Sequence, residues 1–144
     1  MNPNEVIKGL ERERQLLENF ICLSEEQLLV LADEDLDGFD AFLTQRAVLM
    51  IELGAIEDTL ATWIAQIRND ATVPAGIMQQ MRFINDEIVR MANHVLRIDA
   101  QAQIRLEMIR HKSSAELESI EKGRRALQQY GSTYSTDTNL DING

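Results

Sequence analysis

The chain is poor in proline, cysteine and aromatic residues. Its 144 residues include two prolines, one cysteine and 5% aromatic residues. Because proline costs about 3 kcal/mol inside a helix, long segments without proline are open to helix formation. The single cysteine, Cys22, excludes an intrachain disulfide, and its apolar neighbours Ile21 and Leu23 predict a buried thiol. The other apolar residues are mainly Leu, Ile, Met and Ala, which favour helices over strands.

Targeting signals and long apolar runs are also missing from the sequence. No stretch approaches the roughly 18 apolar residues of a membrane-spanning helix. Residues 1–6 lack the basic segment and following apolar run that begin a secretory signal peptide. We therefore expect a soluble, cytoplasmic protein that does not insert into membranes.

Acidic residues outnumber basic residues, and the net charge is −10. Residues 1–40 contain eleven acidic and three basic residues, whereas the stretch 105–125 has a small excess of basic side chains. Nucleic-acid binding requires a dominant basic face, which this distribution does not supply. The charges indicate a solvated helical surface and no nucleic-acid partner.

Apolar residues recur every three or four positions over dozens of residues, which is the spacing of amphipathic helices. The acidic cluster 33–37 and the segment 69–76, which contains Pro74, interrupt this pattern. The expected fold class is therefore all-α, an antiparallel, coiled-coil-like bundle of three long helices in one domain, 1–130. The predicted helices cover about 4–32, 37–69 and 75–130.

The final segment, 131–144, is rich in Ser, Thr, Asn, Asp and Gly. This composition predicts a flexible polar tail.

The predicted third helix is much longer than the other two. At 1.5 Å per residue it spans roughly 80 Å, against roughly 45 and 50 Å for the first two. In an up-down-up arrangement it passes the first turn near residue 107, and residues from about 108 to 130 overhang. A second copy of the chain, a partner protein or a fold-back can cover this overhang. The capping-box spacing of Ser113 and Glu116 keeps open a break near Ser113 that starts a fourth helix.

An acidic motif, Asp33-x-Asp35-x-Asp37-Gly38, matches the first half of an EF-hand calcium loop. The second half does not match, because Thr44 stands where the loop requires a bidentate Glu. We interpret this motif as an acidic turn between helices and expect no metal site.

Asp99 and Gln103 have the D-x-x-x-Q spacing of helical phosphatases that act on response regulators. An acid and an amide at this spacing share one helix face and can orient a water. No nucleophile–base set, phosphate loop or metal cluster accompanies them, and His94 lacks the small neighbouring residue of a phosphotransfer histidine. We therefore expect no enzyme, no catalytic residue and no cofactor, with the phosphatase as the weakest alternative.

Three segments of the chain carry a resemblance to a known family. They are Leu10-Glu-Arg-Glu-Arg-Gln-Leu-Leu17, Asp37-Gly-Phe-Asp-Ala-Phe-Leu-Thr-Gln-Arg46-Ala-Val-Leu49 and Ile120-Glu-Lys-Gly-Arg-Arg-Ala-Leu-Gln-Gln-Tyr130-Gly131. With these segments the chain resembles the FlgN-type flagellar export chaperones, and the resemblance covers roughly residues 5–131. The resemblance implies a cytoplasmic chaperone built from long helices that binds hook–filament junction proteins and delivers them to the flagellar export gate.

The overhang is the expected binding surface for an amphipathic terminal segment of such a substrate. Basic side chains at its rim are expected to steer the orientation of that segment. The resemblance assigns Tyr130 to contact with the export gate, whereas packing on Leu127 is the structural alternative. A self-associating coiled coil that pairs the overhang with its own copy, as a homodimer, remains the rival function. The expected groove residues are Ile109, Leu117, Ile120 and Leu127, and the rim residues are Arg110, Lys112, Arg124 and Arg125.

Overall fold

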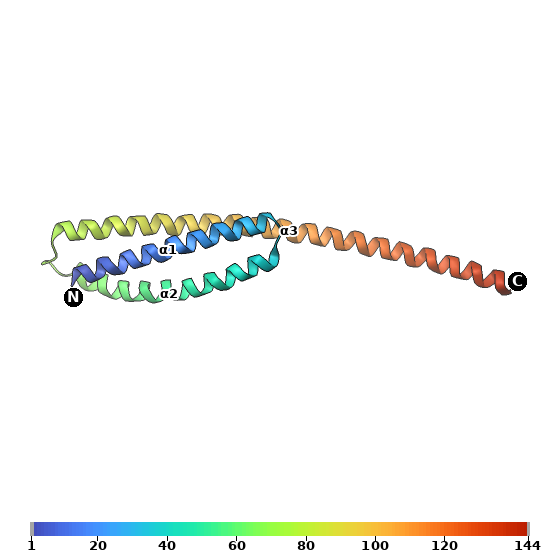
Figure 1. Cartoon of the computed structure of the whole chain (residues 1–144), viewed down its shortest axis with the longest axis horizontal. Helices are drawn as coiled ribbons and strands as arrows, with labels where there is room; N and C mark the ends of the chain where they lie inside the picture. The colour runs from blue at the N-terminus through green and yellow to red at the C-terminus, as the bar shows by residue number, and fades with distance from the viewer. Residues whose placement is uncertain (1, 144) are drawn as a thin grey trace. The chain divides into compact units, whose positions relative to one another are not determined.

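The computed structural model describes the backbone of residues 2–143 and the side chains of residues 2–129. Three helices account for nearly all of these residues, and no strand occurs within the described backbone, which confirms the all-α class. The first two helices begin and end within one residue of the predicted positions. The helices are α1 (Pro3–Ala32), α2 (Leu36–Arg68) and α3 (Ala75–Asn143) (Figure 1).

The acidic cluster forms the turn between α1 and α2. Glu34 adopts the left-handed region with a φ of 58°, which reverses the chain direction. The Asp35 carboxylate then caps α2 by accepting a hydrogen bond from the Gly38 N–H at 3.0 Å. A Cβ atom at Gly38 would lie 2.5 Å from the Asp35 carboxylate, so this cap requires glycine. The predicted acidic turn therefore works as a helix cap.

The turn between α2 and α3 is held by Asp70. Its carboxylate accepts hydrogen bonds from the Thr72 backbone N–H at 2.9 Å and from the Thr72 hydroxyl at 2.5 Å. These hydrogen bonds lower the pKa of Asp70 below its ordinary value of 3.8. Pro74 follows, and its carbonyl accepts from the N–H groups of Ile77 and Met78 in the first turn of α3. Proline thus marks the start of the third helix, as predicted.

The chain divides into two compact units, unit 1 (Met1–Arg105) and unit 2 (Leu106–Gly144). Unit 1 contains α1, α2 and the first part of α3, lying side by side in Figure 1. Apolar side chains from all three helices form its core. Fully or nearly fully buried members include Val6, Leu10 and Leu16 of α1, Leu60 and Ile67 of α2, and Ile84 and Ile88 of α3.

Contacts between helices show the direction of each helix in unit 1. Arg14 of α1 donates to Glu87 of α3 at 2.6 Å, and Arg105 donates to the Ala32 carbonyl at 3.2 Å. Residue numbers therefore rise together along α1 and α3, so these two helices are parallel and α2 runs against both. The predicted up-down-up arrangement is confirmed, and α3 reaches the end of α1 at Arg105, close to the predicted residue 107.

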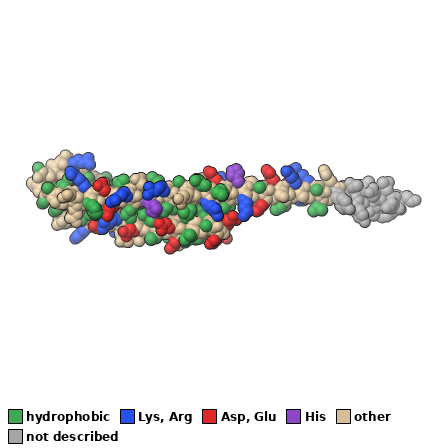
Figure 2. Space-filling view, turned by 90° about the horizontal axis from the view of Figure 1, so that it is seen from above, with side chains coloured by type: hydrophobic (Ala, Val, Ile, Leu, Met, Phe, Trp, Pro, Cys, Tyr) green, Lys and Arg blue, Asp and Glu red, His purple; other side chains and the backbone are tan. Residues whose placement is uncertain are grey.

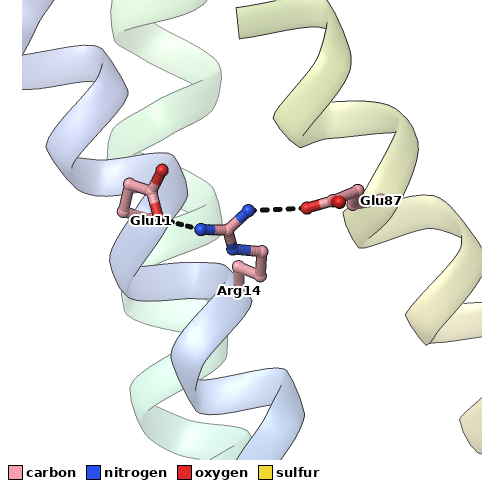
Figure 3. A network of polar contacts seen from close by, with 3 residues as sticks. All are labelled: Glu11, Arg14 and Glu87. Carbon is pink, nitrogen blue, oxygen red and sulfur yellow. Dashed lines mark hydrogen bonds and ion pairs between the residues drawn. The ribbon is translucent and has the colours of Figure 1, made fainter. Parts of the chain in front are cut away.

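Arg14 interrupts the apolar stripe of α1 and joins two helices. Its guanidinium also contacts Glu11 of the same helix, so one arginine bridges two carboxylates (Figure 3). Hydrogen bonding to Glu87 raises the pKa of Arg14 above its ordinary value, which keeps the bridge charged.

Three expectations about local structure need correction or a limit. Cys22 is exposed, because the buried face of α1 runs through Phe20 and Ser24 and leaves Cys22 on the solvent side. α3 is helical through Ser113–Glu116, so the capping-box spacing does not start a fourth helix there. The backbone of residues 131–143 continues α3, so the third helix runs past its predicted end at residue 130. The side chains of the predicted polar tail, 131–144, lie outside the described residues, and its flexibility stays a prediction.

Candidate protein-binding surface

Unit 2 consists of the second part of α3, and its described side chains cover residues 106–129. Met108 is 57% exposed, and three further large apolar side chains of this segment face solvent: Leu117 is 66% exposed, Ile120 66% and Leu127 73%. Their spacings of three and seven residues place them on one face of the helix. We call these three residues the C-terminal stripe. Figure 2 shows apolar and charged side chains at the surface of this segment, next to the grey atoms.

The predicted groove residue Ile109 differs from the other three. It is 9% exposed, so it is buried and does not belong to the C-terminal stripe. It continues the helical spacing of the buried residues Val95, Ile98 and Ala102, which it follows at an interval of seven residues after Ala102. The apolar face of α3 therefore changes from buried to exposed between Ile109 and Leu117.

Two of the predicted rim residues, Arg124 and Arg125, share one partner, Glu121. Arg124 donates to Glu121 at 2.6 Å, and Arg125 lies 3.8 Å from the same carboxylate. Such exposed pairs contribute about 0–1 kcal/mol, so both guanidinium groups can exchange Glu121 for a partner's carboxylate. Arg124 stands four residues after Ile120 and three before Leu127, so it lies on the stripe face itself rather than at its rim.

The other two predicted rim residues, Arg110 and Lys112, lie in the same segment and are exposed. Within the described residues Arg110 makes no hydrogen bond or ion pair, whereas Lys112 interacts with another group. The structure thus brings the predicted basic residues and the C-terminal stripe together on one helical segment. The side chain of Tyr130 lies outside the described residues, and its role stays a prediction.

The carboxylate of Asp99 forms an ion pair with Arg46 of α2. Arg46 Nη2 donates to its two oxygens at 2.8 and 3.0 Å, and Arg46 Nη1 donates to Gln27 Oε1 at 2.7 Å. The guanidinium also lies 4.6 Å from the centre of the Phe20 ring. Asp99 therefore joins α3 to α2 and α1, and this bond competes with any role of Asp99 in orienting a water for hydrolysis.

His94 also has a partner on another helix of unit 1. His94 Nε2 lies 3.4 Å from Glu25 Oε1, which places an ion pair between α3 and α1 when the imidazole is protonated.

Among the side chains that the structure describes, no group of three His, Cys, Asp or Glu residues is arranged to hold a metal ion. Within the same part of the chain, no helix is long and apolar enough to cross a membrane.

Sequence reasoning missed a cavity of about 400 Å³ in unit 1, close to the turn between α2 and α3. Its apolar lining comes from the same stripes that build the core, so no sequence signal separates lining residues from packed ones. The lining residues are Leu10, Ile64, Ile67, Arg68, Met78, Met81, Arg82, Asn85 and Asp86.

Comparison of the chain with protein-family models, with curated proteins and with solved structures gives no match.

Proposed function

We propose that this chain is a non-enzymatic, cytoplasmic chaperone of the FlgN type in the type III flagellar secretion system. It binds an amphipathic terminal segment of a hook–filament junction protein and delivers that protein to the flagellar export gate. The observation that carries the proposal is the exposure of the C-terminal stripe, on the segment for which the resemblance implies substrate binding.

The energetics of the stripe favour a protein partner. Complete burial of one Leu or Ile side chain contributes about 1.5–3 kcal/mol, so the three stripe residues together contribute roughly 5–9 kcal/mol. Association costs an estimated 4–15 kcal/mol in lost translational and rotational freedom. The stripe alone gives weak binding at most, so the partner must bury a comparable apolar face of its own. An amphipathic helix has such a face.

The basic residues of the segment favour acidic side chains in that partner. Arg124 lies between two stripe residues, and Arg110 has no partner within the described part of the chain. A carboxylate on the bound helix would receive charge-assisted hydrogen bonds from either guanidinium. We therefore expect the bound segment to place Asp or Glu beside its apolar positions.

A self-associating coiled coil is the second candidate, because Leu117, Ile120, Arg124 and Leu127 follow the three-four-three spacing of a heptad seam. Arg124 counts against a parallel homodimer, since two like charges would face each other across that seam. A phosphatase has less support, because Asp99 is held by Arg46.

The double variant Ile120→Asp with Leu127→Asp tests the surface. It should abolish co-purification with the terminal segment of a hook–filament junction protein, because two carboxylates replace the apolar contact. Far-UV circular dichroism should stay unchanged, since both side chains are exposed. Leu96→Asp is the matched control, because Leu96 is 65% exposed on the same helix but lies in unit 1. Unaltered capture by the double variant would rule out this surface.

A further inference from the structure

The cavity in unit 1 has an apolar interior. Leu10 comes from α1, Ile64 and Ile67 from α2, and Met78 and Met81 from α3. Its volume of about 400 Å³ lies within the range of known ligand pockets. This space can hold one large apolar side chain, and the two methionines can adapt to its shape.

Two exposed arginines line the cavity. Arg68 at the end of α2 and Arg82 on α3 are both exposed lining residues. Within the described residues neither guanidinium makes a hydrogen bond or an ion pair. This contrasts with Arg14 and Arg46, which bind carboxylates between the helices of the same unit. Arg68 and Arg82 are therefore available to a carboxylate of a bound molecule.

Asn85 and Asp86 complete the polar lining. The Asp86 carboxylate repels a second carboxylate but accepts a hydrogen bond from an N–H group. A fatty acid offers no N–H donor, whereas a peptide offers one at each residue. The combination of two arginines, one amide and one carboxylate is complementary to a peptide end, which has an anionic terminus and neutral N–H donors.

We propose that this cavity binds the C-terminal residue of a peptide whose last side chain is large and apolar. The side chain fills the space between Leu10, Ile67 and Met81. The terminal carboxylate accepts hydrogen bonds from Arg68 and Arg82, and the backbone N–H of the last residue donates to Asp86. Capture of a terminal carboxylate is a known mode of peptide recognition. This site lies in unit 1 and does not rest on the proposed function of the C-terminal stripe.

The test uses the full chain, labelled with nitrogen-15, and three probes. The first probe is the peptide acetyl-Gly-Ser-Gly-Ser-Phe-Leu with a free C-terminal carboxylate, the second is its C-terminal amide, and the third is octanoate. The free-acid peptide should cause saturable shifts of backbone amide signals around Ile67, Met81 and Asn85. The C-terminal amide and octanoate should each bind at least about tenfold more weakly than the free-acid peptide. The amide lacks the anionic carboxylate for Arg68 and Arg82, and octanoate lacks the N–H group for Asp86.

Two variants assign the effect to the arginines. Arg82→Gln should weaken binding of the free-acid peptide about tenfold, because a charge-assisted hydrogen bond is lost. Arg97→Gln is the matched control, since Arg97 is exposed on α3, has no partner within the described residues and does not line the cavity. It should leave the affinity unchanged.

Three results would overturn the proposal: no saturable shift with millimolar peptide, equal affinity for the acid and the amide, or equal affinity of Arg82→Gln and the unchanged chain. Tighter binding of octanoate than of the peptide would also overturn it, in favour of a fatty-acid site. Because Ile120→Asp with Leu127→Asp leaves unit 1 untouched, that variant should still bind the free-acid peptide. Failure of either proposal is thus distinguishable from failure of the other.

Discussion

Replacing Arg46 with methionine should destabilise unit 1 more than any exposed arginine replacement. Arg46 connects all three helices, because it donates to Gln27 of α1 and to Asp99 of α3 and lies over the Phe20 ring. Its side chain is 12% exposed, so little water can take its place. Methionine keeps a long apolar stem but removes every donor.

The expected loss in the free energy of unfolding is the sum of the losses at Gln27, Asp99 and Phe20. Gln27 is 1% exposed, so its carbonyl oxygen loses its partner without access to water, which costs about 1–3 kcal/mol. Asp99 has a side chain 39% exposed, so water replaces the guanidinium there and the loss is about 0–1 kcal/mol. Loss of the contact with Phe20 adds about 0.5–1 kcal/mol. The free energy of unfolding should fall by roughly 2–4 kcal/mol, which lowers Tm by roughly 5–15 °C.

Urea unfolding followed by circular dichroism measures this change directly. Arg97→Met is the control and should change the free energy of unfolding by less than about 0.5 kcal/mol. The double variant Arg46→Met with Gln27→Leu should recover most of the loss, because both members of the buried pair become apolar. Gln27 Nε2 has no hydrogen-bond partner even beside Arg46, which adds to this recovery. A loss below about 1 kcal/mol for Arg46→Met would refute the reasoning.

Two further predictions concern stability. Burial of Glu13, with the nearby Glu57 carboxylate, raises the pKa of Glu13 above its ordinary value of 4.5, so the folded state loses stability as pH rises through that raised pKa. Glu13→Gln should therefore raise the free energy of unfolding at pH 7 and give no gain at pH 3.5 or below; an equal gain at both pH values would contradict this cause. Gly54→Ala should stabilise by up to about 1 kcal/mol, because a Cβ there meets nothing within 4 Å. Gly9→Ala should gain less or lose stability in the same urea assay, because its Cβ would lie 2.7 Å from Leu60 Cδ2; equal gains for both variants would contradict the close approach.

The helices could be predicted from sequence because their ends depend on local chemistry. Pro74 starts α3, and the acidic cluster with Gly38 both reverses the chain and caps α2. The length of α3 also predicted that Leu117 and its neighbours lack contacts within the chain, and the stripe residues are indeed exposed.

Features that depend on how the helices rotate against each other could not be predicted. Arg46 and Asp99 are 53 residues apart, and no local pattern indicates that they meet. Cys22 was predicted to be buried because its neighbours in the sequence are apolar. Adjacent positions of a helix face different directions, so these neighbours do not place Cys22 on the buried face, and its side chain is exposed. The helix-length argument placed Ile109 with the exposed residues of the overhang, whereas the structure buries it. The cavity beside Arg68 arises from imperfect packing, which a sequence does not reveal.

Co-expression of this chain with the terminal segments of hook–filament junction proteins tests the central proposal most directly. The products are separated by size-exclusion chromatography with light scattering, which gives the mass of each complex. The chaperone function predicts a one-to-one complex that the variant Ile120→Asp with Leu127→Asp no longer forms. A stable homodimer that ignores those segments would contradict the chaperone function and favour the self-associating coiled coil.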